Sequence, residues 1–335
     1  ITQYSRIGAV LLAVVQGGSI ATALQNQVAP GGMPVVYAPG MGFVLTAVVA
    51  LTAGTIFLMW LGEQVTERGI GNGVSLIIMA GIVAQMPTFI TNLFEGGRSG
   101  SISGFLIAGL MLLMVVMVLF ICFMERAQRR LLVQYPKRAS QKGMMQADRS
   151  HLPLKLNTAG VIPPIFASSL LLLPLTISQF AGNSLSPDTT MGSVVVTLNQ
   201  MLQHGQPIYM VLYALGIIFF AFFYTAVVFN PEETSENLKR AGGFIPGIRP
   251  GKNTATYLDY VLTRITVIGA IYLTVVALIP ELIHSQLNVS QFIGGTSLLI
   301  MVTVTLDTVT QIQSHLIAQQ YEGLVKRSRL GGKRR

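Results

Sequence analysis

The most constraining feature of the sequence is the segment 151–174, HLPLKLNTAGVIPPIFASSLLLLP, where two prolines interrupt a long apolar run. About 20 apolar residues, each rising ~1.5 Å in a helix, cross a ~30 Å hydrocarbon core. Pro163 and Pro164 remove backbone N–H donors, so some carbonyls lose their helical partners. In lipid, neighbouring helices, polar side chains or water must satisfy those carbonyls. We therefore expect this helix to lie inside a bundle or to line a cavity.

The composition of the whole chain is that of an integral membrane protein. Only 10% of the 335 residues are charged, and the mean hydropathy is +0.61. In a soluble chain the net charge of +9 would suggest nucleic-acid binding, but here the basic residues lie between apolar segments. Cys122 is the single cysteine, which excludes an intrachain disulfide and a thiolate metal site.

Eight segments have the length and hydropathy of transmembrane helices. We therefore predict an all-α integral membrane protein with eight spans. The predicted limits of these spans are 6–24, 40–61, 73–93, 104–123, 157–180, 207–229, 258–279 and 292–315.

The basic residues alternate between the two sides of the predicted membrane. The loops 125–156 and 230–257 and the tail 316–335 are rich in lysine and arginine, whereas the alternate connections hold only Arg98. By the positive-inside rule, we expect both ends of the chain and the basic loops to be cytoplasmic.

The two long cytoplasmic loops exceed the ~2–8 residues that suffice to join neighbouring helices, so we expect functional protrusions. Segment 241–251, AGGFIPGIRPG, is dense in glycine and proline, which make tight turns and present Arg249 at a tip. The alternative is a solvated loop that fixes topology or touches anionic lipid. Loop length and the glycine and proline content favour a docking site.

Residues for catalysis are nearly absent, and we predict no enzyme, no cofactor and no metal site. The four histidines are scattered, and segment 247–253 lacks the spacing and the Ser or Thr of a phosphate loop. Asp259, Arg264 and Asp307 lie near predicted interfaces, where a charge costs less than at mid-membrane. This pattern indicates a passive conduit or a scaffold.

Several long motifs resemble the SecY family of bacterial protein-conducting channels, and they follow the family's order. They are HLPLKLN with AGVIP at 151–163, WLGEQVTERGIGNG at 60–73, FNPEE at 229–233, IPGIRPG at 245–251 and GGTSLLI at 294–300. The resemblance implies a ten-helix, inverted-repeat fold, with the eight spans matching helices three to ten. We expect residues 1–95 to be the remainder of an N-terminal half with three spans, and residues 103–335 to be a C-terminal half with five. The family's first two helices and its plug are expected to be absent from this chain.

The resemblance also implies a function. The chain would be the central pore-forming subunit of the Sec translocon, a passive gated channel. It would pass unfolded secretory polypeptides across the membrane and release transmembrane segments sideways into lipid. The expected partners are the subunits SecE and SecG, the motor ATPase SecA, the ribosome, signal sequences, nascent polypeptides and membrane lipids. The expected location is the bacterial cytoplasmic (inner) membrane.

The family's hydrophobic pore ring falls, by this resemblance, on four apolar residues of three spans. They are Val74, Ile78, Ile165 and Ile300. A ring of apolar side chains can dewet a constriction against ions and still yield around a passing peptide. Ordinary helix packing is the alternative role for each residue.

The resemblance further implies a lateral gate and a docking site. It places Asn157 and Thr158 at the gate, where polar groups would bond weakly across a helix seam. Basic side chains of the docking site would meet ribosomal RNA phosphates. The residues implied for SecA and ribosome docking are Arg249, Arg129, Arg130, Arg138, Lys142 and Tyr321.

Two other function classes remain open at this stage. A secondary transporter could use the same helices and inverted halves, but it predicts a coupling-ion site at mid-membrane. An insertase or assembly scaffold without an open pore would need the docking loops, yet it would tolerate polar residues in the ring.

Overall fold

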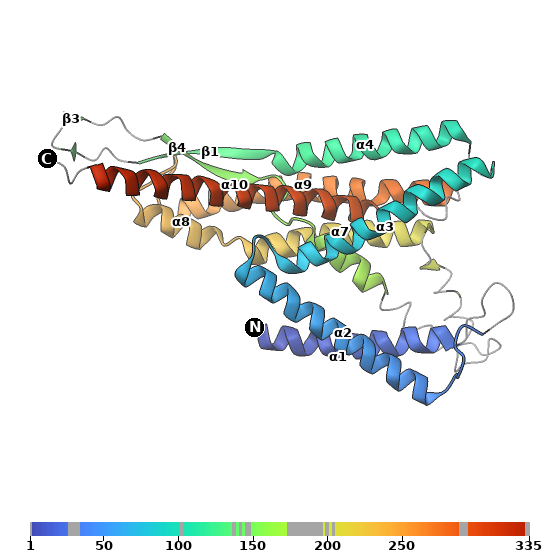
Figure 1. The fold of residues 1–335 in the computed structure, drawn as a ribbon. Helices are drawn as coiled ribbons and strands as arrows, with labels where there is room; N and C mark the ends of the chain where they lie inside the picture. The colour runs from blue at the N-terminus through green and yellow to red at the C-terminus, as the bar shows by residue number, and fades with distance from the viewer. Residues whose placement is uncertain are drawn as a thin grey trace. The chain divides into compact units, whose positions relative to one another are not determined.

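The computed structural model shows a mostly helical fold (Figure 1). It describes residues 2–25, 34–100, 103–135, 139–140, 143–144, 149–172, 197, 201–202, 205–287 and 294–331. The helices are α1 Thr2–Gln25, α2 Met41–Arg68, α3 Gly73–Arg98, α4 Gly104–Arg126, Ile162–Leu172, α7 Pro207–Val228, α8 Pro231–Arg240, α9 Lys252–Leu287 and α10 Gly295–Gly331. The strands are β1 Gln128–Gln134, β2 Ala139–Ser140, β3 Gly143–Met144 and β4 Arg149–Lys155.

Seven of the described helices are long and apolar enough to cross a membrane. They overlap seven of the eight predicted spans. One of these candidate spans, Pro207–Arg240, includes both α7 and α8. The remaining predicted span, 157–180, is described only to residue 172 and contains the short apolar helix Ile162–Leu172. The rest of that span lies outside the described residues.

The chain divides into two compact units. The first contains residues 1–86, 170–203 and 304–335, and the second contains residues 87–169 and 204–303. The sequence-based division into halves at residues 95 and 103 stays a prediction.

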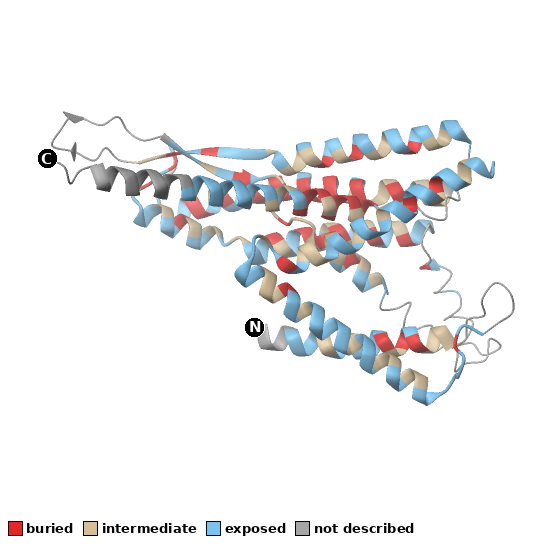
Figure 2. Ribbon diagram, viewed as in Figure 1, coloured by how far each residue is buried: buried red, intermediate tan, exposed pale blue. Residues whose placement is uncertain are grey.

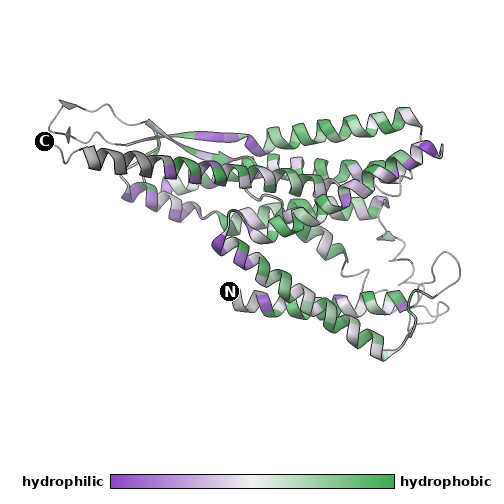
Figure 3. Cartoon of the chain, in the orientation of Figure 1, coloured by the Kyte–Doolittle hydropathy of each residue, from purple (hydrophilic) through white to green (hydrophobic). Residues whose placement is uncertain are grey.

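In the first unit, α1 and α2 pack side by side in opposite directions. Arg6 meets Glu63 near one end of the pair, and the Gln25 side chain donates to the Gly40 carbonyl at the other end. Most apolar side chains of α2 are nevertheless exposed (Figures 2 and 3). Exposed apolar surface on this scale marks contact with lipid or with other proteins.

In the second unit, α9 is the central helix. It packs against α7 and α8 and also contacts α4. Leu258, Leu273 and Val276 of α9 are fully buried, which makes this helix the most covered candidate span (Figure 2).

We predicted that the two prolines would interrupt the interior of a helix, and this prediction was wrong. Pro163 and Pro164 lie in the first turn of Ile162–Leu172, and both are fully buried. The N–H groups of a first turn have no intrahelical acceptor, so proline there costs no helical hydrogen bond. The helix therefore starts at Ile162 rather than at Asn157 and needs no internal kink at these residues.

The all-α prediction also needs correction outside the spans. β1 and β4 form an antiparallel pair in which Arg129 lies opposite Leu154 and Leu132 lies opposite His151. The short strands β2 and β3 pair in the same loop. Part of the first long loop is therefore a β-hairpin.

Gly269 allows another segment of this unit to approach α9 closely. A Cβ atom at this position would lie 2.8 Å from the Leu156 carbonyl oxygen. Real Cβ atoms do not approach a backbone oxygen so closely, so one of the two backbones would have to move. Gly269 thus lets the segment before Ile162–Leu172 lie directly on α9.

We expect Gly269→Ala to destabilise the full-length protein by about 1–3 kcal/mol, because overpacking displaces the backbone. Gly109→Ala on α4 is the matched control, since a Cβ there meets no described atom within 4 Å. Unfolding in mixed detergent micelles, followed by tryptophan fluorescence, measures both variants. Equal midpoints for the two would contradict the close packing at Gly269.

Candidate functional site

The two long basic loops fold together into one structure, which we call the platform: residues 128–134, 149–155 and 241–251. The link between the loops is a bridge between Gln134 and Phe244. The Gln134 N–H donates to the Phe244 carbonyl at 2.9 Å, and the Phe244 N–H donates back at 3.0 Å. The second loop therefore extends the β-hairpin of the first.

A small hydrophobic core lies under the platform. Leu131 and Leu154 from the hairpin and Ile245 from the second loop pack with residues near the start of α9. The α9 residues of this cluster are Leu258, Val261 and Ile265. The core fixes both loops to the same helix, because each contributes side chains that are at most 6% exposed.

Gly243 brings the second loop against the hairpin. A Cβ atom there would lie 2.9 Å from the Tyr135 ring and 3.1 Å from a Val133 methyl group. The Gly243 N–H donates to the Leu238 carbonyl at 2.9 Å, so the loop turns directly off the end of α8.

The Arg249 turn is held by two side-chain hydrogen bonds to its backbone. The Ser235 hydroxyl donates to the Gly251 carbonyl at 2.7 Å, and the Thr254 hydroxyl donates to the Arg249 carbonyl at 3.0 Å. The Arg249 side chain itself is exposed. A fixed backbone with an exposed guanidinium suits binding to carboxylates or phosphates.

The other predicted docking residues are described only in part. Arg129 and Arg130 are exposed on β1, part of which is coloured hydrophilic in Figure 3. Arg138 and Lys142 lie outside the described residues. Tyr321 belongs to the α10 backbone, and its side chain is likewise outside the description. The structure thus brings Arg129 and Arg130 onto the same platform as Arg249.

The predicted pore-ring residues are divided between the two units. Val74 and Ile78 lie one turn apart on α3 in the first unit and are 47% and 40% exposed. In the second unit Ile165 is partly exposed, and Ile300 is 7% exposed. Each unit contributes two residues, and the complete ring stays a prediction.

The two predicted gate residues have local partners in the second unit. Asn157 is buried, and its Nδ2 donates to Glu125 Oε1 at 2.6 Å and to the Gly160 carbonyl at 3.1 Å. The Thr158 hydroxyl donates to the Lys155 carbonyl at 3.0 Å. Their role at a seam stays a prediction.

Glu125 is a residue that sequence reasoning missed. It lies at the end of α4, and its Oε1 accepts a hydrogen bond from Tyr272 as well, at 3.3 Å. The signal in the sequence was an acid next to an apolar span, a position usually occupied by an interfacial charge. The contact with Tyr272 joins α4 to α9.

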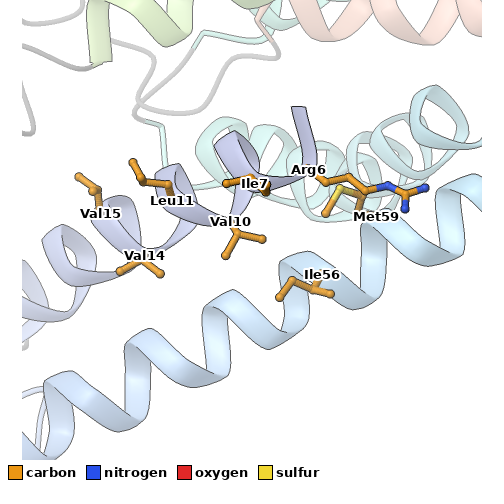
Figure 4. Close-up of a pocket in the computed structure, with 8 residues that line it drawn as sticks. All are labelled: Arg6, Ile7, Val10, Leu11, Val14, Val15, Ile56 and Met59. Atoms are coloured by element: carbon orange, nitrogen blue, oxygen red, sulfur yellow. The ribbon is translucent and has the colours of Figure 1, made fainter. Parts of the chain in front are cut away.

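The first unit contains an apolar groove of about 530 Å³ between α1 and α2 (Figure 4). Seven apolar side chains and Arg6 line it, and the Arg6 guanidinium binds both oxygens of Glu63 at 2.8–2.9 Å. The lining suits hydrocarbon and offers no groups for catalysis. Among the described residues, no group of three His, Cys, Asp or Glu side chains could hold a metal ion.

Comparisons with known proteins identify the family. A SecY family model matches residues 1–309. The protein translocase subunit SecY of Rickettsia conorii is 50% identical over 330 residues, which cover 98% of this chain and 74% of that protein. The SecY subunit of Escherichia coli K12 is 48% identical over 332 residues, covering 99% and 73%.

Solved structures show the same fold. A SecY structure concerned with the channel's plug domain superposes with a TM-score of 0.65 at 17% identity, covering 94% of this chain and 73% of that one. A protein-conducting channel gives 0.64 at 16% identity, covering 94% and 72%. Sec61 in a canine ribosome–channel complex gives 0.59 at 15% identity, covering 94% and 72%.

The shared core predicts that the two loops of the platform loosen together. We expect Leu258→Ala to cost about 2–5 kcal/mol, because it leaves a cavity under both loops. Backbone hydrogen exchange should then accelerate in 129–134 and in 244–249 alike. The control is Leu119→Ala, which removes an exposed side chain of α4. Acceleration in only one loop would show that they are separate structures.

Proposed function

The chain belongs to the SecY family, and on that premise we propose that it is the pore-forming subunit of a Sec translocon. The subunit is a passive gated channel that passes unfolded polypeptides across the membrane and releases apolar segments sideways into lipid. The family match over residues 1–309 carries this proposal. The described architecture supports it, because the second unit combines apolar helices of spanning length with a platform that carries exposed arginines.

The platform is the proposed docking site for SecA and the ribosome. Its exposed arginines are Arg129, Arg130 and Arg249, and they project from backbone that is fixed by the hairpin and by the bonds around Gly251. Fixed positive groups attract RNA phosphates or acidic protein surfaces with a strong dependence on salt. Arg138, Lys142 and Tyr321 are included by the resemblance alone.

The membrane-embedded roles follow the family's arrangement. We assign the spans to helices three to ten of an inverted-repeat fold, with SecE and SecG as partner subunits in the bacterial inner membrane and both chain ends in the cytoplasm. Val74, Ile78, Ile165 and Ile300 form the pore ring. Asn157 and Thr158 lie at the gate through which signal sequences leave. The energy for transport comes from the docked partner, so this subunit is not itself an enzyme.

Arg249→Glu in the full-length protein is expected to slow motor-driven export by about tenfold or more, because it reverses the charge that meets the partner. Export of a secretory precursor into inverted membrane vesicles is the measurement. Arg240→Glu is the matched control, since Arg240 is an exposed arginine of the neighbouring α8 that pairs with Glu236. Both variants should insert in the membrane in normal amounts. Normal export by Arg249→Glu would remove Arg249 from the docking site.

A translocation-arrested precursor should crosslink to single cysteines that replace Ile165 and Ile300 on a Cys122→Ser background. The reason is that both side chains line the polypeptide path in the proposed channel. Cysteines at Leu119 and Val211, which are 64% and 59% exposed apolar positions, serve as controls. Strong crosslinks at the controls and none at the ring, with export still active, would place the path elsewhere. Unimpaired export with Asn at both ring positions would favour a scaffold without an open pore.

A further inference from the structure

A carboxylate joins three segments of the second unit, which we call the Glu125 node: Glu125, Asn157, Gly160 and Tyr272. Glu125 Oε1 accepts hydrogen bonds from Asn157 Nδ2 at 2.6 Å and from the Tyr272 hydroxyl at 3.3 Å. Asn157 Nδ2 also donates to the Gly160 carbonyl at 3.1 Å. The node therefore connects the end of α4, the turn before the helix Ile162–Leu172, and the middle of α9.

The orientation of the Asn157 amide is determined by its surroundings. Two acceptors, a carboxylate and a carbonyl, face Nδ2, so a flipped amide would set oxygen against oxygen. Asn157 is 5% exposed and Tyr272 is 3% exposed, so little water competes for these bonds. Hydrogen bonds to an ionised group are shorter and stronger than neutral ones, in keeping with the 2.6 Å separation.

Close backbone and small-residue contacts surround the node. The carbonyl of Leu156 lies on α9 where Gly269 leaves room for it. Ala159 packs with Ala221 of α7 and Ala270 of α9 in one buried cluster. These contacts hold the turn against two helices, and the hydrogen bond between Asn157 and Glu125 attaches it to α4.

We propose that Glu125 is a positioning residue that fixes the base of the helix Ile162–Leu172 to α4 and α9, so that these elements move as one body. The consequence for gating rests on the proposed function, in which this helix forms one side of the lateral gate. A gate helix with a fixed base opens only when the whole group of helices moves. If its base is not fixed, the helix opens separately from α4 and α9, and its opening depends less on the signal sequence.

The direct test is a distance measurement in the full-length protein with its partner subunits in lipid nanodiscs. Spin labels replace Leu119 on α4 and Ser169 near the end of Ile162–Leu172, both exposed positions, on a Cys122→Ser background. Pulsed electron paramagnetic resonance gives the distribution of the label separation. We expect one narrow population that stays unchanged when a precursor occupies the channel.

Tyr272→Phe and Glu125→Ala should broaden that distribution or add a second population. Losing a hydrogen bond to a charged group is expected to shift the equilibrium between the attached and detached helix by about tenfold. Tyr260→Phe is the matched control, because it removes an exposed hydroxyl from the same helix α9. Tyr272→Phe removes only one oxygen atom, so it keeps the test decisive if Glu125→Ala does not fold.

A narrow, unchanged distribution in both node variants would overturn the proposal. So would a label separation that changes in the unmodified protein on occupation by a precursor. The resting distances do not depend on transport, so a failure of the proposed function would appear as absent export with the node effect intact.

Exchanging the amide and the carboxyl group between Asn157 and Glu125 gives an independent test. Asn157→Asp places carboxylate oxygen against Glu125, and we expect precursors with weakly apolar signal sequences to be exported with less discrimination. Adding Glu125→Gln restores a donor–acceptor pair of reversed polarity and should recover part of that discrimination. A purely structural defect would reduce the export of precursors with strong and weak signal sequences equally, and Glu125→Gln would not restore export. That outcome would count against a positioning role.

Discussion

Every backbone polar group in a membrane needs a partner within the protein, because the hydrocarbon core offers no water. The seven described spans meet this constraint as helices. Segment 156–161 is not helical and depends on other elements. The Leu156 N–H donates to the Ala127 carbonyl at 3.0 Å, and Asn157 Nδ2 donates to the Gly160 carbonyl. One of these bonds reaches the residue after α4 and the other closes the segment on itself, while Ala221 of α7 and Ala270 of α9 pack against Ala159 and help to cover it.

Hydropathy predicted seven of the spans because a lipid-crossing helix is selected mainly by length and apolar content. Local signals that compete with hydropathy were read less well. Helix α8 has a clear start: the Asn230 side chain accepts from the Glu232 N–H at 3.0 Å, and Pro231 occupies the first turn. These capping signals were present in the sequence, but the charged composition was interpreted as loop. The hairpin was missed because only three consecutive residues of β1, 131–133, are apolar.

The site shows a similar division between local and long-range information. Loop length and composition predicted functional protrusions and an exposed Arg249. They could not show that Gln134 pairs with Phe244 across two separate loops, because such pairing depends on the tertiary packing on α9. Glu125 was missed for the same reason: an acid at a span end is common, and its importance lies in the buried partners Asn157 and Tyr272. Whether the four predicted pore-ring residues form a ring depends on how the two units are arranged, because each unit contributes two of them.

The platform and the helix Ile162–Leu172 are connected by a very short piece of chain. Leu154 belongs to the platform core, Asn157 to the Glu125 node, and the helix begins at Ile162. Because this connection is short and held at both ends, a displacement of the platform moves the start of the helix as well. Proximity alone does not establish coupling, which requires an element with two states that both sites bias. Under the proposed function the helix Ile162–Leu172 is that element, and Glu125 decides whether it changes state alone or together with α4 and α9.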